Sequence, residues 1–233
     1  MNNPQLPLGL TLRDSACFDS YFPGSNREAV DSLQQAAAGQ GEAFVYLAGA
    51  DGMGKTHLLQ AACHKACQDR CTTAYLPLRH IPELPAAAFD GLERLALVCL
   101  DDIEVLAGDS SGEKALFNLF NRMHDAGSHL LVAATGRADK AGFQLPDLVS
   151  RLGWGVTYQL KPLVDAEVLA ALSYRATGRG LELPEETAAF LLKRIPRDLP
   201  SVFDLLDRLD EASMIEQRRL TIPFVKSVLD LAL

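Results

Sequence analysis

Short hydrophobic runs recur between residues 43 and 160, and each is followed by a longer stretch in which hydrophobic residues return every three or four positions. Runs that are hydrophobic at nearly every position are typical of strands buried on both faces, and the longer period is typical of helices. The runs cover residues 43–49, 72–78, 95–102, 129–135 and 155–160. The pattern predicts an α/β fold with a sheet of about five parallel strands.

The pattern changes after Pro162, where the strand-like runs stop. Four amphipathic segments follow, at residues 165–177, 184–194, 200–217 and 223–231, and several prolines lie near their expected starts. The second part is therefore predicted to be a small all-helical subdomain. We expect three regions: a flexible N-terminal peptide at 1–12, an α/β subdomain at 13–161 and a helical lid at 162–233.

The composition of the 233-residue chain is that of an ordinary globular protein, with 48% hydrophobic and 22% charged residues. We find no hydrophobic run long enough to span a membrane and no positively charged N-terminal region typical of a signal peptide. Five cysteines, an odd number, favour reduced thiols over a disulfide framework. These features predict a cytoplasmic protein with no membrane partner.

The formal net charge of −8 argues against extensive direct contact with nucleic acid. Affinity for a phosphate backbone comes mainly from Lys and Arg side chains that displace counterions. Any contact with DNA is therefore expected to be indirect, through a partner.

The strongest chemical signal follows the first predicted strand, where "GADGMGKT" satisfies the phosphate-loop pattern G-x-x-x-x-G-K-[ST]. Glycines let the backbone turn tightly and bring successive N–H groups onto phosphate oxygens at the start of a helix. Lys55 would reach the terminal phosphates of ATP or ADP, and the Thr56 hydroxyl would bind Mg²⁺. The predicted nucleotide-binding residues here are Gly49, Asp51, Gly52, Met53, Gly54, Lys55, Thr56 and His57.

A second acidic element is expected at the same edge of the sheet, because the run "LALVCLDDIE" ends in Asp101 and Asp102. Asp101 would hold Mg²⁺ together with Thr56, and Asp102 would polarise an attacking water molecule. Asp102 is one methylene shorter than the glutamate common at this position. The sequence therefore predicts nucleotide binding with weak or no intrinsic ATPase activity.

Two other patterns do not predict a site. Cys63, Cys67 and Cys71 recur every four residues near two histidines, but Cys63 falls on the apolar face of the predicted helix and Cys71 falls beyond its end. Reduced thiols at or near the core explain them better than a metal site does. Ser, His and Asp are present, but no nucleophile-elbow pattern places a serine for acyl transfer.

These features together resemble a known family. The segments are "FDSYFPGSN" (18–26), the phosphate loop, "CLDDIE", "DLVSRLGWG" (147–155) and the four-helix tail. They are similar to the AAA+ module of the bacterial replication initiator DnaA. The N-terminal "QLPLGL" and the tail "RRLTIPFVKSVLDLAL" are more similar still to the Hda family of DnaA regulatory inactivators.

The resemblance gives a role to the N-terminal peptide. In that family a glutamine- and leucine-rich peptide binds the beta sliding clamp of DNA polymerase III, and an extended peptide with a proline loses little entropy when it docks. The matching residues are Gln5, Leu6, Pro7, Leu8, Gly9 and Leu10. The alternative is that the leucines pack back on the domain.

The resemblance also assigns residues outside the phosphate loop. Thr135 matches the sensor that hydrogen-bonds the terminal phosphate, and Arg151 matches the arginine finger inserted into a neighbouring subunit's nucleotide site. Arg197 matches the second sensor, carried by the lid, and Phe18 and Phe22 match the apolar wall over the base. The alternatives are a surface arginine at 151, a helix start at 197 and core packing of the two phenylalanines.

The function implied by the resemblance is inactivation of DnaA. The protein would carry ADP, dock on the DNA-loaded clamp and offer Arg151 to ATP bound by DnaA, so that hydrolysis prevents re-initiation. No segment resembling the initiator's DNA-binding domain is seen before the sequence ends at Leu233, so DNA is expected to be met through the clamp. Alternatives are a self-sufficient ATPase acting as a helicase loader, a pure adaptor, or a duplex-binding initiator variant; homo-oligomers are also possible.

Overall fold

A computed structural model describes residues 16–81, 86–178, 180–194, 199–216 and 218–230. The chain divides into two compact units, which are described separately. Of the described residues, those within 16–21, 28–50 and 55–160 form the first unit, and those within 22–27, 51–54 and 161–230 form the second. Within the described ranges, no helix combines the length and the apolar character that crossing a bilayer requires.

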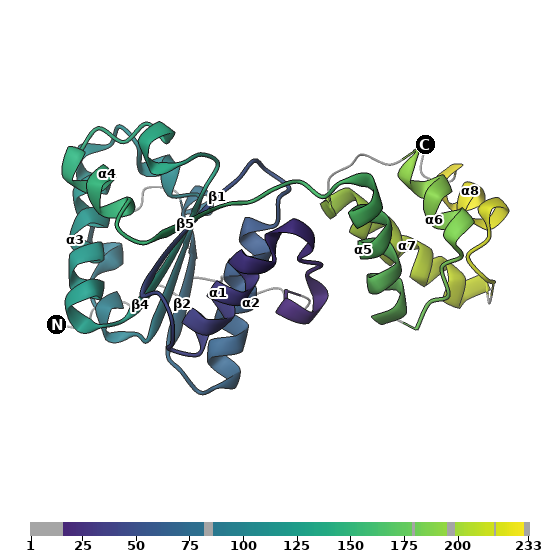
Figure 1. The fold of residues 1–233 in the computed structure, drawn as a ribbon, viewed down its shortest axis with the longest axis horizontal. Coiled ribbons are helices and arrows are strands. Elements are labelled where there is room, and N and C mark those ends of the chain that lie inside the picture. Colours follow the sequence, from purple (N-terminus) through teal and green to yellow (C-terminus); the bar gives the residue numbers. More distant parts are fainter. Residues whose placement is uncertain (1–15, 82–85, 179, 195–198, 217, 231–233) are drawn as a thin grey trace. The chain divides into compact units, whose positions relative to one another are not determined.

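The first unit is built on a parallel five-stranded sheet with strand order β2-β3-β4-β1-β5 (Figure 1). Its strands are β1 (Phe44–Ala48), β2 (Thr73–Pro77), β3 (Leu97–Asp101), β4 (His129–Ala134) and β5 (Val156–Gln159). Each strand lies within one of the five hydrophobic runs of the sequence. The predicted α/β fold with its parallel sheet is thus confirmed.

Helices cover both faces of this sheet, which explains why its central strands are hydrophobic at every position. Figure 1 shows α1 (Arg27–Ala37) and α2 (Lys55–Gln68) on one side, and α3 (Ser110–Ala126) and α4 (Pro146–Leu152) on the other. Along β1, Phe44, Tyr46 and Ala48 pack in the core beneath α3, and the residues between them face the opposite layer. All five residues of β1 are buried.

Short 3-10 helices form many of the connections. They are η1 (Phe18–Ser20), η2 (Gly24–Asn26), η3 (Leu78–His80), η4 (Ala86–Phe89), η5 (Leu92–Arg94), η6 (Ile103–Leu106) and η7 (Ala138–Lys140). Two of them, η3 and η6, follow β2 and β3 directly. They therefore lie at the carboxyl edge of the sheet, where ligands bind in open α/β folds.

The described residues of the second unit beyond Lys161 lie mainly in helices. The unit contains α5 (Asp165–Gly178), α6 (Glu185–Leu192), α7 (Leu199–Glu216) and α8 (Ile222–Asp230), each within two residues of its predicted bounds. Leu191, Leu209, Phe224 and Val225 are fully buried and form the centre of its core. The predicted all-helical lid is confirmed.

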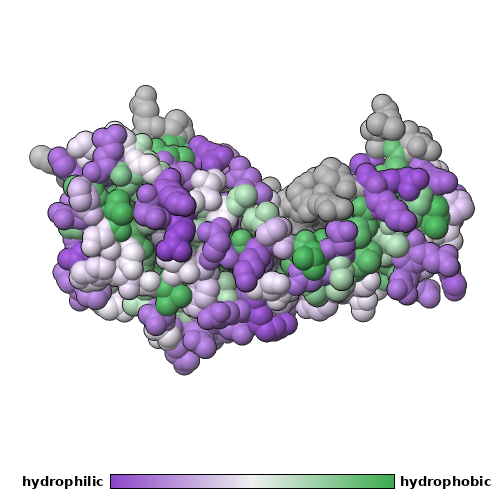
Figure 2. All heavy atoms as spheres, turned by 45° about the horizontal axis from the view of Figure 1, so that its top comes forward, coloured by the Kyte–Doolittle hydropathy of each residue, from purple (hydrophilic) through white to green (hydrophobic). Residues whose placement is uncertain are grey.

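Residues of the "FDSYFPGSN" segment also belong to this unit. Asn26 is buried, and its side chain accepts a hydrogen bond from the Lys161 N–H at 2.8 Å and donates one to the Lys161 carbonyl at 2.9 Å. Two bonds to the backbone of one residue fix the chain just before the helices begin. On the face that Figure 2 shows, hydrophilic residues predominate and hydrophobic residues lie between them in small groups.

Candidate nucleotide-binding site

The phosphate-loop segment connects β1 to α2, as the sequence predicts. Gly52 and Gly54 have φ angles of 80° and 86°, in the left-handed region that side chains with a Cβ atom rarely adopt. Helix α2 begins at Lys55, so Lys55 and Thr56 lie in its first turn. The loop therefore leads into a helix N-terminus, where the helix dipole favours an anion.

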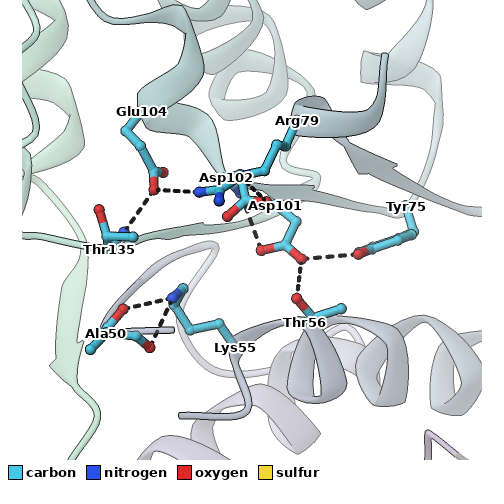
Figure 3. Close-up of polar contacts among 10 residues, drawn as sticks. Ala50, Lys55, Thr56, Tyr75, Arg79, Asp101, Asp102, Glu104 and Thr135 are labelled. Atoms are coloured by element: carbon cyan, nitrogen blue, oxygen red, sulfur yellow. Dashed lines mark hydrogen bonds and ion pairs between the residues drawn. The ribbon is translucent and has the colours of Figure 1, made fainter. Parts of the chain in front are cut away.

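Lys55 is folded back onto this loop and is only 5% exposed. Its ammonium group donates hydrogen bonds to the Gly49 carbonyl at 2.6 Å and to the Ala50 carbonyl at 3.1 Å (Figure 3). A buried cation requires acceptors, and these carbonyls supply neutral ones. A bound phosphate would supply anionic acceptors to the same ammonium group.

Asp101 is the last residue of β3 and is 2% exposed. Residues alternate between the faces of a strand, so Asp101 shares a face with Leu97 and Cys99. The Thr56 hydroxyl donates a hydrogen bond to Asp101 Oδ2 at 2.6 Å. The structure thus brings together the two residues predicted to bind Mg²⁺.

Tyr75 on β2 reaches the same carboxylate. Its hydroxyl donates to Asp101 Oδ2 at 2.9 Å (Figure 3). Burial raises the pKa of Tyr75, and the negative charge of Asp101 raises it further, so the phenol keeps its proton and remains a donor. Tyr75 could not be found from the sequence, because its place opposite Cys99 depends on the pairing of β2 with β3.

Asp102 is held by an arginine. It has a left-handed backbone conformation, with φ 57° and ψ 46°, and its carboxylate lies 3.2 Å from Arg79 Nε. Burial raises the pKa of Asp102 and the neighbouring Asp101 raises it further, whereas Arg79 lowers it. The group predicted to polarise water is therefore engaged in an ion pair.

Glu104 on η6 joins this pair to the end of β4. The Thr135 backbone N–H donates to Glu104 Oε1 at 3.1 Å, and Arg79 Nη2 lies 3.6 Å from the same oxygen. The other oxygen, Oε2, is buried and has no hydrogen-bond partner among the described residues. Arg79 and Glu104 were both missed from the sequence, although Glu104 stands in the quoted segment "CLDDIE".

The N-terminal segment contacts the start of α2 through His57. The His57 Nε2 atom lies 2.9 Å from the Cys17 carbonyl oxygen and 3.3 Å from the Ser20 hydroxyl. Along the sequence these two residues flank Phe18, which is half-buried. Phe22 belongs to the second unit, where its ring meets that of Tyr174 edge-on at 6.2 Å. The two phenylalanines predicted to cover the base thus lie in different units.

Arg151 lies in the last turn of α4, with its guanidinium carbon 3.8 Å from the centre of the Trp154 ring. Arg197 and the peptide Gln5–Leu10 lie outside the described residues. Asp51 and Met53 lie in the phosphate loop, and both belong to the second unit.

The cysteines are free thiols. Cys63 and Cys99 are buried, Cys67 is exposed, and Cys71 follows the end of α2. A hydrogen bond from Cys99 lowers the pKa of Cys63, and burial raises that of Cys99. In the part of the chain that the structure describes, no three His, Cys, Asp or Glu side chains gather as a metal site would need.

The residues present fit a magnesium nucleotide. Mg²⁺ is commonly held by one or two carboxylates and by phosphate oxygens while it keeps several waters. Asp101 and Thr56 would hold the ion, and Lys55 and the loop N–H groups would hold the phosphates. The ion would supply positive charge that neutralises the phosphate oxygens.

Two family models match separate parts of the chain. Residues 12–77 match the bacterial DnaA ATPase domain, and residues 165–229 match the Hda lid domain. The first match includes the phosphate loop, and the second includes α5, α6, α7 and most of α8.

Several solved structures have the same fold. Domain III of Thermotoga maritima DnaA is 20% identical with a TM-score of 0.79, and the match covers 95% of this chain and 98% of that one. AMPPCP-bound DnaA from Aquifex aeolicus is 21% identical with a TM-score of 0.75, covering 89% and 68%. The Thermotoga maritima Holliday junction branch migration motor RuvB is 19% identical with a TM-score of 0.67, covering 88% and 67%.

Proposed function

We propose that the chain is a DnaA-related AAA+ protein and a regulatory inactivator of the initiator DnaA. The observation that carries the proposal is the Hda-type lid at residues 165–229 in a chain whose phosphate-loop segment matches the DnaA ATPase domain. In this proposal Arg151 enters the nucleotide site of a neighbouring DnaA subunit. The guanidinium stabilises charge that develops on the transferred phosphoryl group.

The protein's own site binds a nucleotide, which we propose to be ADP with Mg²⁺. Lys55 and the loop bind the phosphates, and Asp101 and Thr56 orient the metal ion. The Arg79–Asp102 ion pair of 3.2 Å supports a regulatory role for this site, because the carboxylate that would position an attacking water is already engaged by a guanidinium. AMPPCP in a DnaA of the same fold supports binding of an adenine nucleotide.

We propose further that Gln5–Leu10 dock on the beta sliding clamp in the cytoplasm. A clamp loaded on DNA would hold the protein near DnaA and raise its local concentration, so that modest contacts suffice. The protein then contacts DNA only through the clamp. The clamp-facing residues of the proposal are Gln5, Leu6, Pro7, Leu8, Gly9 and Leu10.

The decisive assay follows hydrolysis of ATP bound to purified DnaA, in the presence of DNA-loaded clamp. The protein should accelerate hydrolysis, and replacing Gln5 and Leu6 with alanine should abolish both clamp binding and acceleration while MgADP affinity stays as in the wild type. Unchanged hydrolysis on adding the wild-type protein would reject the proposal.

Asp102→Asn separates this function from that of a self-sufficient ATPase. If hydrolysis takes place in the site of DnaA, the variant should stimulate DnaA as well as the wild type does. If the protein hydrolyses ATP itself, the isolated wild type should turn over ATP and Asp102→Asn should lower that rate about 100-fold or more, the scale of general acid–base contributions. That second outcome would contradict the proposal.

A further inference from the structure

Trp154 is the single tryptophan of the chain, and it is 59% exposed. Large aromatic side chains are usually well buried, so an exposed one calls for a physical reason. Its ring is nevertheless anchored, because it meets Phe120 edge-on at 6.4 Å and His124 edge-on at 6.1 Å, both on α3. One face of the ring is left to receive Arg151.

The backbone around Trp154 is fixed on both sides. The Trp154 N–H donates to the Arg151 carbonyl at 3.0 Å, which closes a tight turn after α4. Gly155 follows, where a Cβ atom would overlap the Phe44 carbonyl oxygen. The turn and the close approach to β1 together place the indole beneath the side chain of Arg151.

Arg151 lies over this ring. The guanidinium carbon lies 3.8 Å from the ring centroid, and the described residues give Arg151 neither an ion pair nor a side-chain hydrogen bond. Arg79 and Arg122, by contrast, pair with acidic side chains. A stacked guanidinium presents its flat face to the ring, so its five N–H donors, which lie in the plane, stay available.

We propose that Trp154 is the positioning residue for Arg151. It holds the guanidinium in place without occupying its donors, so that they can meet the phosphoryl oxygens of a nucleoside triphosphate bound by a neighbouring AAA+ subunit. A long arginine side chain has many rotamers, and stacking removes part of the entropy cost of ordering it. This inference rests on the proposed function, in which Arg151 acts on ATP held by DnaA.

The test combines a spectroscopic and a kinetic measurement. Because Trp154 is the sole tryptophan, its fluorescence reports the stack in the free protein. Arg151→Gln should change the emission, whereas the matched control Arg194→Gln, which removes a guanidinium 3.9 Å above the Phe190 ring of the lid, should not. Unchanged emission in Arg151→Gln would show that Arg151 does not lie over the Trp154 ring, and would overturn the proposal.

The kinetic measurement is stimulated hydrolysis of DnaA-bound ATP. Trp154→Ala should lower the stimulated rate about threefold to fivefold, the scale of an exposed cation–π contact, and Trp154→Phe should restore most of it. MgADP affinity and clamp binding confirm that both variants are folded. A Trp154→Ala protein as active as the wild type, or a Trp154→Phe protein as impaired as Trp154→Ala, would overturn the proposal.

The two measurements separate this inference from the proposed function. Failure of the wild-type protein to stimulate hydrolysis would reject the proposed function, and the role of Trp154 with it. Stimulation that depends on Arg151 but is indifferent to Trp154 would reject the inference alone.

Discussion

At the scale of single residues, the site is organised around one buried carboxylate. Asp101 accepts hydrogen bonds from Thr56 and Tyr75 on the same oxygen and from the Asp102 N–H on the other, at 3.1 Å. Three donors fix the orientation of a group that would otherwise rotate. The carboxylate is thereby prepared for a cation before one binds.

This arrangement predicts a metal-dependent role for Tyr75. Tyr75→Phe removes one donor from Asp101 and should weaken MgADP binding about threefold to tenfold, the net scale of a single hydrogen bond, while ADP without Mg²⁺ binds as before. Isothermal titration with and without Mg²⁺ measures both. The control is Tyr158→Phe, on β5 at the other edge of the sheet, which should bind like the wild type. An equal loss with and without Mg²⁺ would show that Tyr75 does not act through the metal.

At the scale of elements, α3 positions the segment that carries Arg151. Glu113 on α3 is buried, and its carboxylate accepts hydrogen bonds from the N–H groups of Gly108, Gln144 and Leu145. The last two directly precede α4. Burial opposes the ionisation of Glu113, but these hydrogen bonds outweigh it and lower its pKa below the ordinary value of 4.5.

Because this pKa is lowered by folding, the carboxylate stabilises the protein above about pH 4.5, and the contribution is lost as the pH falls through the lowered value. Glu113→Gln should lower the free energy of unfolding by about 2 kcal/mol at pH 7, since the buried N–H groups lose their charged acceptor. The deficit should shrink as the solution is acidified below pH 4.5. Denaturant unfolding followed by Trp154 fluorescence measures it, with exposed Glu186→Gln as control. A deficit that stays constant with pH would contradict this account.

The close approach of Gly155 to β1 gives a second prediction at the scale of elements. Gly155→Ala puts a methyl group onto the Phe44 carbonyl oxygen, so β5 must shift away from β1. We expect a loss of about 3 kcal/mol or more in the free energy of unfolding. Gly178→Ala is the control, because a Cβ atom there meets nothing within 4 Å. Equal melting temperatures of the two variants would contradict the close approach.

At the scale of the whole molecule, the sequence was enough to predict the sheet, the lid and the Thr56–Asp101 pair. Strands buried on both faces leave an unbroken hydrophobic signal, and the alternation along β3 fixes the face of Asp101. Tyr75 and Arg79 could not be found in this way. Their contacts depend on which strand lies beside β3, and that order follows from the packing of the entire sheet.

The central claim is that Arg151 acts in the nucleotide site of another protein. The most direct measurement is single-turnover hydrolysis of radiolabelled ATP bound to DnaA, with DNA-loaded clamp and either the wild-type protein or Arg151→Ala. The wild type should accelerate hydrolysis, and Arg151→Ala should lower that acceleration about 1,000-fold or abolish it, the scale of an arginine finger, while it still binds the clamp and MgADP. Full acceleration by Arg151→Ala would contradict the account.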